Sequence, residues 1–246
     1  MSKKQKRLIW CLSITLVISI ILGGFAVFLS IYYKADTDTV DAFLSTNNVT
    51  VEEQKKFTSF TPRTESKTGL IFYPGGKVEY KSYYPLMYTL AEYGIFTAVV
   101  KMPFNLAVLD SDAADNVKAE YPEIENWYIG GHSLGGAMAA NHLSKNEDEF
   151  DGLILLGAYS TKDISDFDVP ALSVYGSLDK VMNKGKYEKC LSNMPSDFSE
   201  FIIEGGCHAY FGAYGEQKGD GEATLSAEEQ IFITAAYIYQ FIASHG

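Results

Sequence analysis

The stretch from Trp127 to Ala140, W-Y-I-G-G-H-S-L-G-G-A-M-A-A, constrains the fold of this chain more than any other. Its first three residues are aromatic or apolar and predict the end of a buried strand, whereas the small residues from Gly135 onward predict a closely packed helix. The pentapeptide between them, Gly131 to Gly135, has the pattern G-x-S-x-G with Ser133 at its centre. A serine on a sharp turn from strand to helix indicates a nucleophile elbow.

The two outer glycines of this pentapeptide have a physical role. On so tight a turn the residues two before and two after the serine crowd each other, and a Cβ at either place would clash. Gly131 and Gly135 remove that clash. The N-terminus of the following helix favours negative charge near Ser133, as on an attacked carbonyl oxygen.

The remainder of the chain alternates short apolar strands with helices, which predicts a parallel sheet covered on both faces. We expect an α/β fold with a mostly parallel, doubly wound sheet and no insertion long enough for a lid domain. The predicted strands are 69–73, 95–100, 127–130, 152–156, 171–175 and 201–203, and the predicted helices are 84–93, 112–120, the helix after Ser133, and 227–243.

The N-terminus predicts a membrane anchor. Residues 1–7 are basic, and Leu8 to Tyr33 runs for 26 residues without a charge, which is long enough to span a bilayer. No small-x-small site ends this run, so we favour an uncleaved signal anchor over residues 1–34 to a cleaved signal peptide. The basic flank should stay in the cytoplasm, which would put residues 35–246 on the extracytoplasmic side. Cys11 would then face lipid.

Residues 35–67 are polar and weakly patterned. We expect this segment to start as a stalk and to end as the approach to a catalytic domain over 68–246. Short helices are predicted at Asp41–Leu44 or Val51–Lys56, and an edge strand at Phe57–Thr61.

Charge excludes one class of partner. From residue 36 onward the chain carries 15 Lys and Arg against 31 Asp and Glu, a net charge of −16. So acidic a domain is a poor binder of nucleic acid.

A serine nucleophile needs a histidine to accept its proton and a carboxylate to orient that histidine. In this kind of sheet these groups follow the carboxyl ends of strands, in the order Ser, Asp or Glu, His. Asp179, directly after the strand 171–175, and His208, just past the strand 201–203, satisfy both rules. The other histidines fit less well: His132 should point away from the serine hydroxyl, His142 lies far along the elbow helix, and His245 is next to the chain end.

An oxyanion hole needs two backbone N–H donors. One should be Leu134, and the other should come from the loop after the first buried strand, Pro74-Gly75-Gly76-Lys77. We choose Gly76, with Lys77 close behind. Met102, Phe104, Tyr210 and Phe211 lie in loops on the same edge and are candidates for an apolar substrate pocket, although packing residues would have the same sequence pattern.

The sequence resembles the α/β-hydrolase superfamily, in particular the small lidless group related to dienelactone hydrolases and carboxylesterases. The resemblance implies Ser133 as nucleophile, Asp179 as orienting acid, His208 as base, and no cofactor. Cys207 departs from the pattern, since a small polar residue such as Asn is expected before the histidine. The resembling stretches, spread over 68–245, are 72–78, 100–107, 130–136, 176–179 and 206–212.

These observations predict a membrane-anchored, extracytoplasmic serine hydrolase that cleaves a small-molecule carboxylic ester. An acyltransferase using the same triad, a non-catalytic binding module on this fold, and a peptidase are the alternatives. Cys190 and Cys207 could pair in an oxidising compartment or stay as free thiols. Without an elbow, Cys207 is a much weaker candidate nucleophile than Ser133. We expect no metal site.

Overall fold

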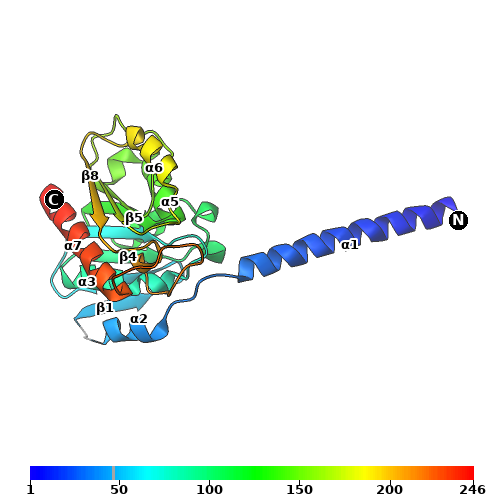
Figure 1. Cartoon of the computed structure of the whole chain (residues 1–246), viewed down its shortest axis with the longest axis horizontal. Helices are drawn as coiled ribbons and strands as arrows, with labels where there is room; N and C mark the ends of the chain where they lie inside the picture. The colour runs from blue at the N-terminus through cyan, green and yellow to red at the C-terminus, as the bar shows by residue number, and fades with distance from the viewer. Residues whose placement is uncertain (46–47) are drawn as a thin grey trace. The chain divides into compact units, whose positions relative to one another are not determined.

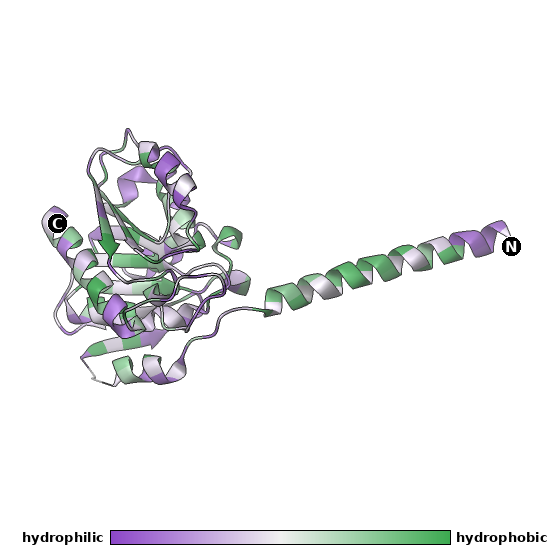
Figure 2. Cartoon of the chain, viewed as in Figure 1, coloured by the Kyte–Doolittle hydropathy of each residue, from purple (hydrophilic) through white to green (hydrophobic). Residues whose placement is uncertain are grey.

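The computed structural model describes residues 1–45 and 48–246, which divide into two compact units. The first, Met1–Tyr32, contains the single helix α1 (Lys3–Ser30), and the second comprises Tyr33–Gly246 (Figure 1). Figure 2 shows α1 apolar along most of its length and hydrophilic at its N-terminal turns. In the described chain α1 is the one helix whose length and composition would suffice to cross a membrane.

The second unit is built on one eight-stranded sheet with the order β1-β2-β4-β3-β5-β6-β7-β8. The six strands from β3 to β8 are parallel, whereas β1 and β2 join the β4 edge in antiparallel register. The strands are β1 (Val49–Glu53), β2 (Phe57–Pro62), β3 (Thr68–Tyr73), β4 (Phe96–Val100), β5 (Asn126–His132), β6 (Gly152–Leu156), β7 (Ala171–Gly176) and β8 (Phe198–Ile203).

Helices cover both faces of this sheet (Figure 1). The α-helices are α2 (Thr37–Leu44), α3 (Tyr84–Glu92), α4 (Ala114–Glu120), α5 (Leu134–Leu143), α6 (Lys184–Cys190) and α7 (Ala227–His245). Short 3₁₀ turns, η1 to η6, lie at Tyr80–Tyr83, Pro103–Asn105, Ala107–Leu109, Glu147–Glu149, Leu191–Asn193 and Ala209–Phe211.

The central strands alternate between two cores. Leu70 and Phe72 of β3 point into the core under α3 and α7, whereas Ile71 and Tyr73 of the same strand point into the core under α4 and α5. Both faces of the sheet are therefore apolar, and for this reason the sequences of the parallel strands are continuous apolar runs. The predicted α/β fold with a mostly parallel sheet is confirmed, and no large lid interrupts the described chain.

The structure corrects the expectations for residues 35–67. The segment does contain a helix over Asp41–Leu44, as part of α2, but Val51–Lys56 is not helical because β1 pairs there with β2. The predicted strand at Phe57 exists, yet it is not an edge strand, since β1 lies outside it. Rather than starting as a stalk, the described residues of this segment belong to the compact unit that begins at Tyr33. Helix α6 was also missed by the sequence pattern.

The fold predicts that the described part of residues 35–67 stabilises the unit Tyr33–Gly246. Phe60 of β2 is fully buried and its ring packs edge-on against Tyr84 of α3, with centroids 5.1 Å apart. We expect Phe60→Ala to lower the free energy of unfolding by about 3–5 kcal/mol, measured by urea unfolding of the full chain in mild detergent. Phe232→Ala, which removes an exposed ring on α7, is the control and should cost less than half as much. Equal, small losses would mean that β2 is not part of the core.

Candidate active site

Ser133 occupies the turn between β5 and α5. Its backbone has φ 54° and ψ −121°, a conformation that a non-glycine residue rarely adopts. Its N–H donates to the Leu156 carbonyl of β6 at 2.9 Å, which fastens the turn to the neighbouring strand. The sharp strand-to-helix turn predicted around Ser133 is therefore present.

Backbone strain is concentrated at this edge of the sheet. Among the described residues, four non-glycine residues have positive φ: Lys77, Phe104, Asn105 and Ser133. They follow β3, β4 and β5, whose carboxyl ends meet at one edge because the strands are parallel. Strained residues of this kind gather at functional sites, so the strain supports the location derived from the motif.

Asp179 and His208 lie in the loops after β7 and β8 and face each other. Nδ1 of His208 is 2.8 Å from Oδ2 of Asp179, and both side chains are almost fully buried. The other carboxylate oxygen, Oδ1, accepts the N–H groups of Val181 and Met182, both at 2.8 Å. The carboxylate is thus held at both oxygens, and it fixes the orientation of the imidazole ring.

Gly157, after β6, lies between this pair and the serine. It lines the same pocket as Ser133, and a Cβ on it would come within 2.9 Å of His208 Nδ1 and 3.2 Å of Asp179 Oδ2. In the described chain no hydrogen bond joins the Ser133 hydroxyl to His208. Such contacts commonly tighten only when substrate binds.

Two further side chains hold the loops that contain Asp179 and His208. Asp220 accepts the N–H of Lys180 through Oδ1 at 3.2 Å and that of Ala209 through Oδ2 at 2.8 Å, so it joins the neighbours of Asp179 and His208. Gln230 of α7, fully buried, accepts from the Cys207 N–H and donates to the Cys207 carbonyl. Sequence reasoning assigned a role to neither residue. Asp220 and Gln230 therefore fix the backbone beside Asp179 and His208.

The predicted oxyanion donors lie side by side. A Cβ on Gly76 would meet Leu134 Cδ2 at 2.8 Å, so Gly76 lies directly against the side chain of Leu134. Lys77, the alternative donor, has its N–H committed to the Asn105 carbonyl at 2.7 Å. As the first residue of α5, Leu134 has an N–H with no partner within the helix. The geometry therefore favours Gly76 over Lys77.

A pocket of about 390 Å³ opens beside Ser133. No Asp, Glu, Lys or Arg lines it, and its walls are mostly apolar. The lining residues are Ser133, Leu134, Ala137, Met138, Gly157, Ala158, Tyr159, Thr161, Val181, Met182 and Asn183.

The four predicted substrate-binding residues lie outside this lining. Met102 and Phe211 are buried, Tyr210 is partly exposed, and Phe104 is exposed. Their role in binding substrate stays a prediction. The pocket residues Val181 and Met182 were missed, since the loop after Asp179 carries no motif beyond the aspartate itself.

His132 packs against His208. Its ring is buried, with its centroid 4.4 Å from that of His208. Nδ1 lies 2.8 Å from the Tyr83 hydroxyl, which also accepts the Gly75 N–H at 3.0 Å. Which of the two groups donates depends on the tautomer of His132. These contacts connect the turn at Ser133 with the loop after β3 and with His208.

Burial lowers the pKa of His132 well below its ordinary value, and positive charge on His208 lowers it further. His132 is therefore neutral at neutral pH.

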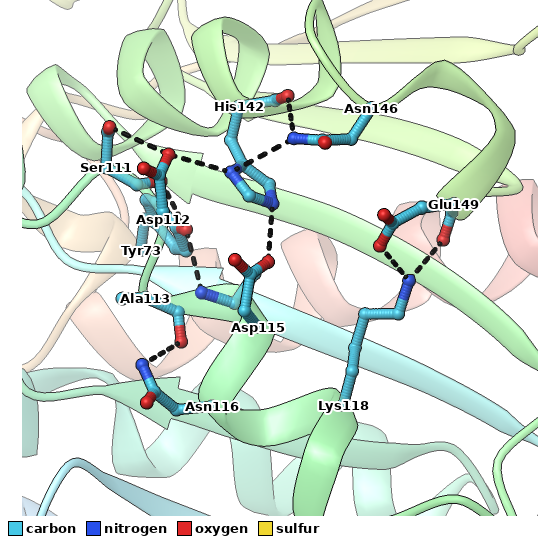
Figure 3. Close-up of polar contacts among 11 residues, drawn as sticks. Tyr73, Ser111, Asp112, Ala113, Asp115, Asn116, Lys118, His142, Asn146 and Glu149 are labelled. Carbon is cyan, nitrogen blue, oxygen red and sulfur yellow. Dashed lines mark hydrogen bonds and ion pairs between the residues drawn. The ribbon is translucent and has the colours of Figure 1, made fainter.

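His142, set aside as a catalytic candidate, ties the elbow helix to α4 (Figure 3). Its Nδ1 lies 3.2 Å from Asp112 Oδ1, and its Nε2 lies 3.3 Å from Asp115 Oδ1 but outside hydrogen-bond geometry. Beside it, Tyr73, the last residue of β3, donates to the Ser111 carbonyl and accepts the Ala114 N–H. These contacts fix α5, and hence Ser133, relative to β3 and α4.

The cysteines do not contribute a nucleophile or a bridge. Cys190 and Cys207 are free thiols. Burial raises the pKa of Cys207 to about 12, so its thiol stays protonated at neutral pH. Over the described residues no group of three or more His, Cys, Asp and Glu could hold a metal ion.

Fold and site together define an α/β protein with a serine elbow at the carboxyl edge of its sheet. The chain belongs to the α/β hydrolase family, which its sequence matches over residues 69–232. No curated protein matches it in sequence.

Solved structures share the fold at low sequence identity. A CIB-like hydrolase from Thermoplasma acidophilum is 16% identical with a TM-score of 0.57, covering 78% of this chain and 99% of that one. Est1E from Butyrivibrio proteoclasticus is 14% identical with a TM-score of 0.56, covering 80% of this chain and 100% of that one.

The buried neutral state of His132 predicts a pH effect on stability. Below the ordinary pKa of 6.5 the unfolded chain binds a proton at this residue and the folded chain does not, so stability falls as the pH falls. Between pH 7.5 and 5.5 this residue should account for a loss of about 1.4 kcal/mol in the free energy of unfolding. His132→Gln should show a correspondingly smaller loss in urea titrations at the two pH values. An unchanged pH dependence would contradict a buried neutral His132.

Proposed function

We propose that the protein is a serine hydrolase of carboxylic esters, with Ser133 as nucleophile, His208 as base and Asp179 as orienting acid. The observation that carries the proposal is the buried 2.8 Å contact between His208 and Asp179, next to a serine whose backbone is held in a strained turn. Burying a carboxylate is costly, and here two backbone N–H groups and the His208 ring offset that cost in the arrangement that an orienting acid needs.

The reaction follows from these positions. His208 accepts the proton of the Ser133 hydroxyl as Oγ attacks the ester carbonyl, and Asp179 stabilises the imidazolium that forms. The N–H groups of Leu134 and Gly76 donate to the oxyanion. His208 then gives its proton to the leaving alcohol, and water activated by His208 releases the acyl group from Ser133.

The pocket supports a neutral, apolar substrate group. A charged group would leave water for a pocket without an opposite charge, and that transfer is unfavourable. The pocket volume suits a short acyl or alkyl group rather than a peptide side chain with a charge. The uncharged pocket therefore favours an ester with a short, neutral acyl or alkyl group over a peptide with a charged side chain.

We also propose that α1 anchors this unit in a membrane with the catalytic unit on the extracytoplasmic side. The apolar helix supports the span, and Lys3, Lys4, Lys6 and Arg7 before it support a cytoplasmic N-terminus.

Ser133→Ala should lower kcat/KM for a short p-nitrophenyl ester by at least about 1,000-fold, because the attacking oxygen is lost. It should also abolish labelling by a fluorophosphonate probe. Ser144→Ala, at the far end of the same helix, should label and turn over like the wild type. Labelling that persists in Ser133→Ala, or a folded wild type that neither labels nor turns over ester, would refute the proposal.

The anchor predicts that the full chain stays with phospholipid vesicles through an alkaline carbonate wash. A chain that starts at Tyr33 should stay in the supernatant, because it lacks α1. Sedimentation followed by immunoblotting measures both. Release of the intact full chain by carbonate would contradict a membrane-spanning helix, and a shortened product in cells would indicate a cleaved signal peptide.

A further inference from the structure

The catalytic edge carries an exposed apolar patch. Among the described residues of the unit Tyr33–Gly246, three large apolar side chains are more than half exposed: Phe104 at 58%, Val108 at 51% and Leu109 at 54%. All three lie on η2 and η3, in the segment after β4. We call them the 104–109 patch. Apolar side chains gathered in this way mark a contact surface.

Local hydrogen bonds hold the backbone of the 104–109 patch in one conformation. Phe104 and Asn105 have positive φ, which costs free energy. Three successive turns close the segment, through N–H to carbonyl bonds from Asn105 to Met102, from Leu106 to Pro103 and from Leu109 to Leu106. Ala107, between the exposed residues, is fully buried and fastens the segment to the core. The apolar side chains are therefore presented by an ordered segment.

Backbone hydrogen bonds connect the patch to the oxyanion loop, and connect that loop to the first residue of the unit. The Lys77 N–H donates to the Asn105 carbonyl at 2.7 Å, and the Lys77 carbonyl accepts the Tyr33 N–H at 2.7 Å. The Tyr33 carbonyl in turn accepts the Glu79 N–H at 2.9 Å. Tyr33 also lies against the loop of the base, since its hydroxyl accepts the Lys218 N–H at 3.2 Å.

Chain length then limits how far this edge can be from a membrane. Helix α1 ends at Ser30, and three Cα–Cα steps of about 3.8 Å lead from Ser30 to Tyr33, or about 11 Å at full extension. If α1 spans a bilayer, Tyr33 lies within that distance of the end of the span at any orientation of the helix.

Charge does not supply the contact. The chain from residue 36 onward has a net charge of −16, so anionic lipid repels it overall. Contact through the patch would come from burial of apolar side chains, and it should form on zwitterionic lipid.

We propose that the 104–109 patch rests on the bilayer that holds α1, and that the substrate is an ester carried by that bilayer, a lipid-like amphiphile with its ester at the water interface. This inference rests on the proposed hydrolase function and on the anchor. The patch keeps the oxyanion loop at the interface, where the ester of such an amphiphile lies.

The test uses the full chain reconstituted in phosphatidylcholine vesicles, with two substrates. One is soluble p-nitrophenyl acetate, and the other is 4-heptadecylumbelliferyl acetate, which carries the same short acyl group and is held in the bilayer by its alkyl chain. The double variant Val108→Ser, Leu109→Ser should lose about tenfold or more on the bilayer ester and keep its rate on the soluble one. The control Ile202→Ser, Phe232→Ser, which removes two similarly exposed side chains elsewhere, should keep both rates.

A second measurement needs no turnover. Leu109→Trp should show emission that brominated phosphatidylcholine quenches beyond the wild-type level, whereas Ile202→Trp should not. Absence of quenching overturns the inference, as does equal loss or no loss on both substrates. Self-association that depends on Val108 and Leu109 without quenching would assign the patch to a second copy and also overturn it. If the wild type cleaves neither ester yet Leu109→Trp is quenched, the hydrolase proposal fails while membrane contact stands.

Discussion

The structure depends on one close approach, that of the start of α5 to the end of β3. A Cβ on Gly135 would lie 2.2 Å from the Tyr73 carbonyl oxygen, and one on Gly131 would lie 2.6 Å from the Gly135 carbonyl carbon. No side chain fits in either place. Only with both positions bare can the chain reverse so sharply that Ser133 takes a positive φ and its hydroxyl stands clear of the sheet.

Contacts from several elements maintain this strained arrangement. Tyr73 and His142 hold α4 and α5 together on one face, while Tyr83 and His132 connect the oxyanion loop to the elbow on the other. Because these contacts come from residues far apart in the chain, the turn cannot relax alone. The same reasoning applies to Asp179 and His208, whose loops are joined through Asp220.

Contacts of the same kind reach the segment at Tyr33, near the start of the second unit. The backbone of Tyr33 is hydrogen-bonded to the loop after β3. Asp36 donates its N–H to the carbonyl of Ala213, which follows His208 in the chain. The residues from Tyr33 to Asp36 are therefore hydrogen-bonded to the loops at the carboxyl edge of the sheet. A membrane anchor would therefore hold this edge of the sheet close to the bilayer. That closeness is the physical basis of the bilayer contact proposed for the 104–109 patch.

Local patterns in the sequence were sufficient for the parallel strands, the turn at Ser133, and the expectation that Asp179 and His208 follow strands. These predictions succeed because glycine placement and apolar runs act over a few residues, and chain order limits which loops share an edge. The pairing of β1 with β2, the burial of His132 against His208, and the clamps from Asp220 and Gln230 depend on contacts between distant segments. No local pattern encodes such contacts. The sequence by itself determined the strand–elbow–helix turn and the kind of chemistry it allows, and only the tertiary structure decided which side chains hold the acid, the base and the oxyanion loop in place, because those side chains meet only after the sheet has formed.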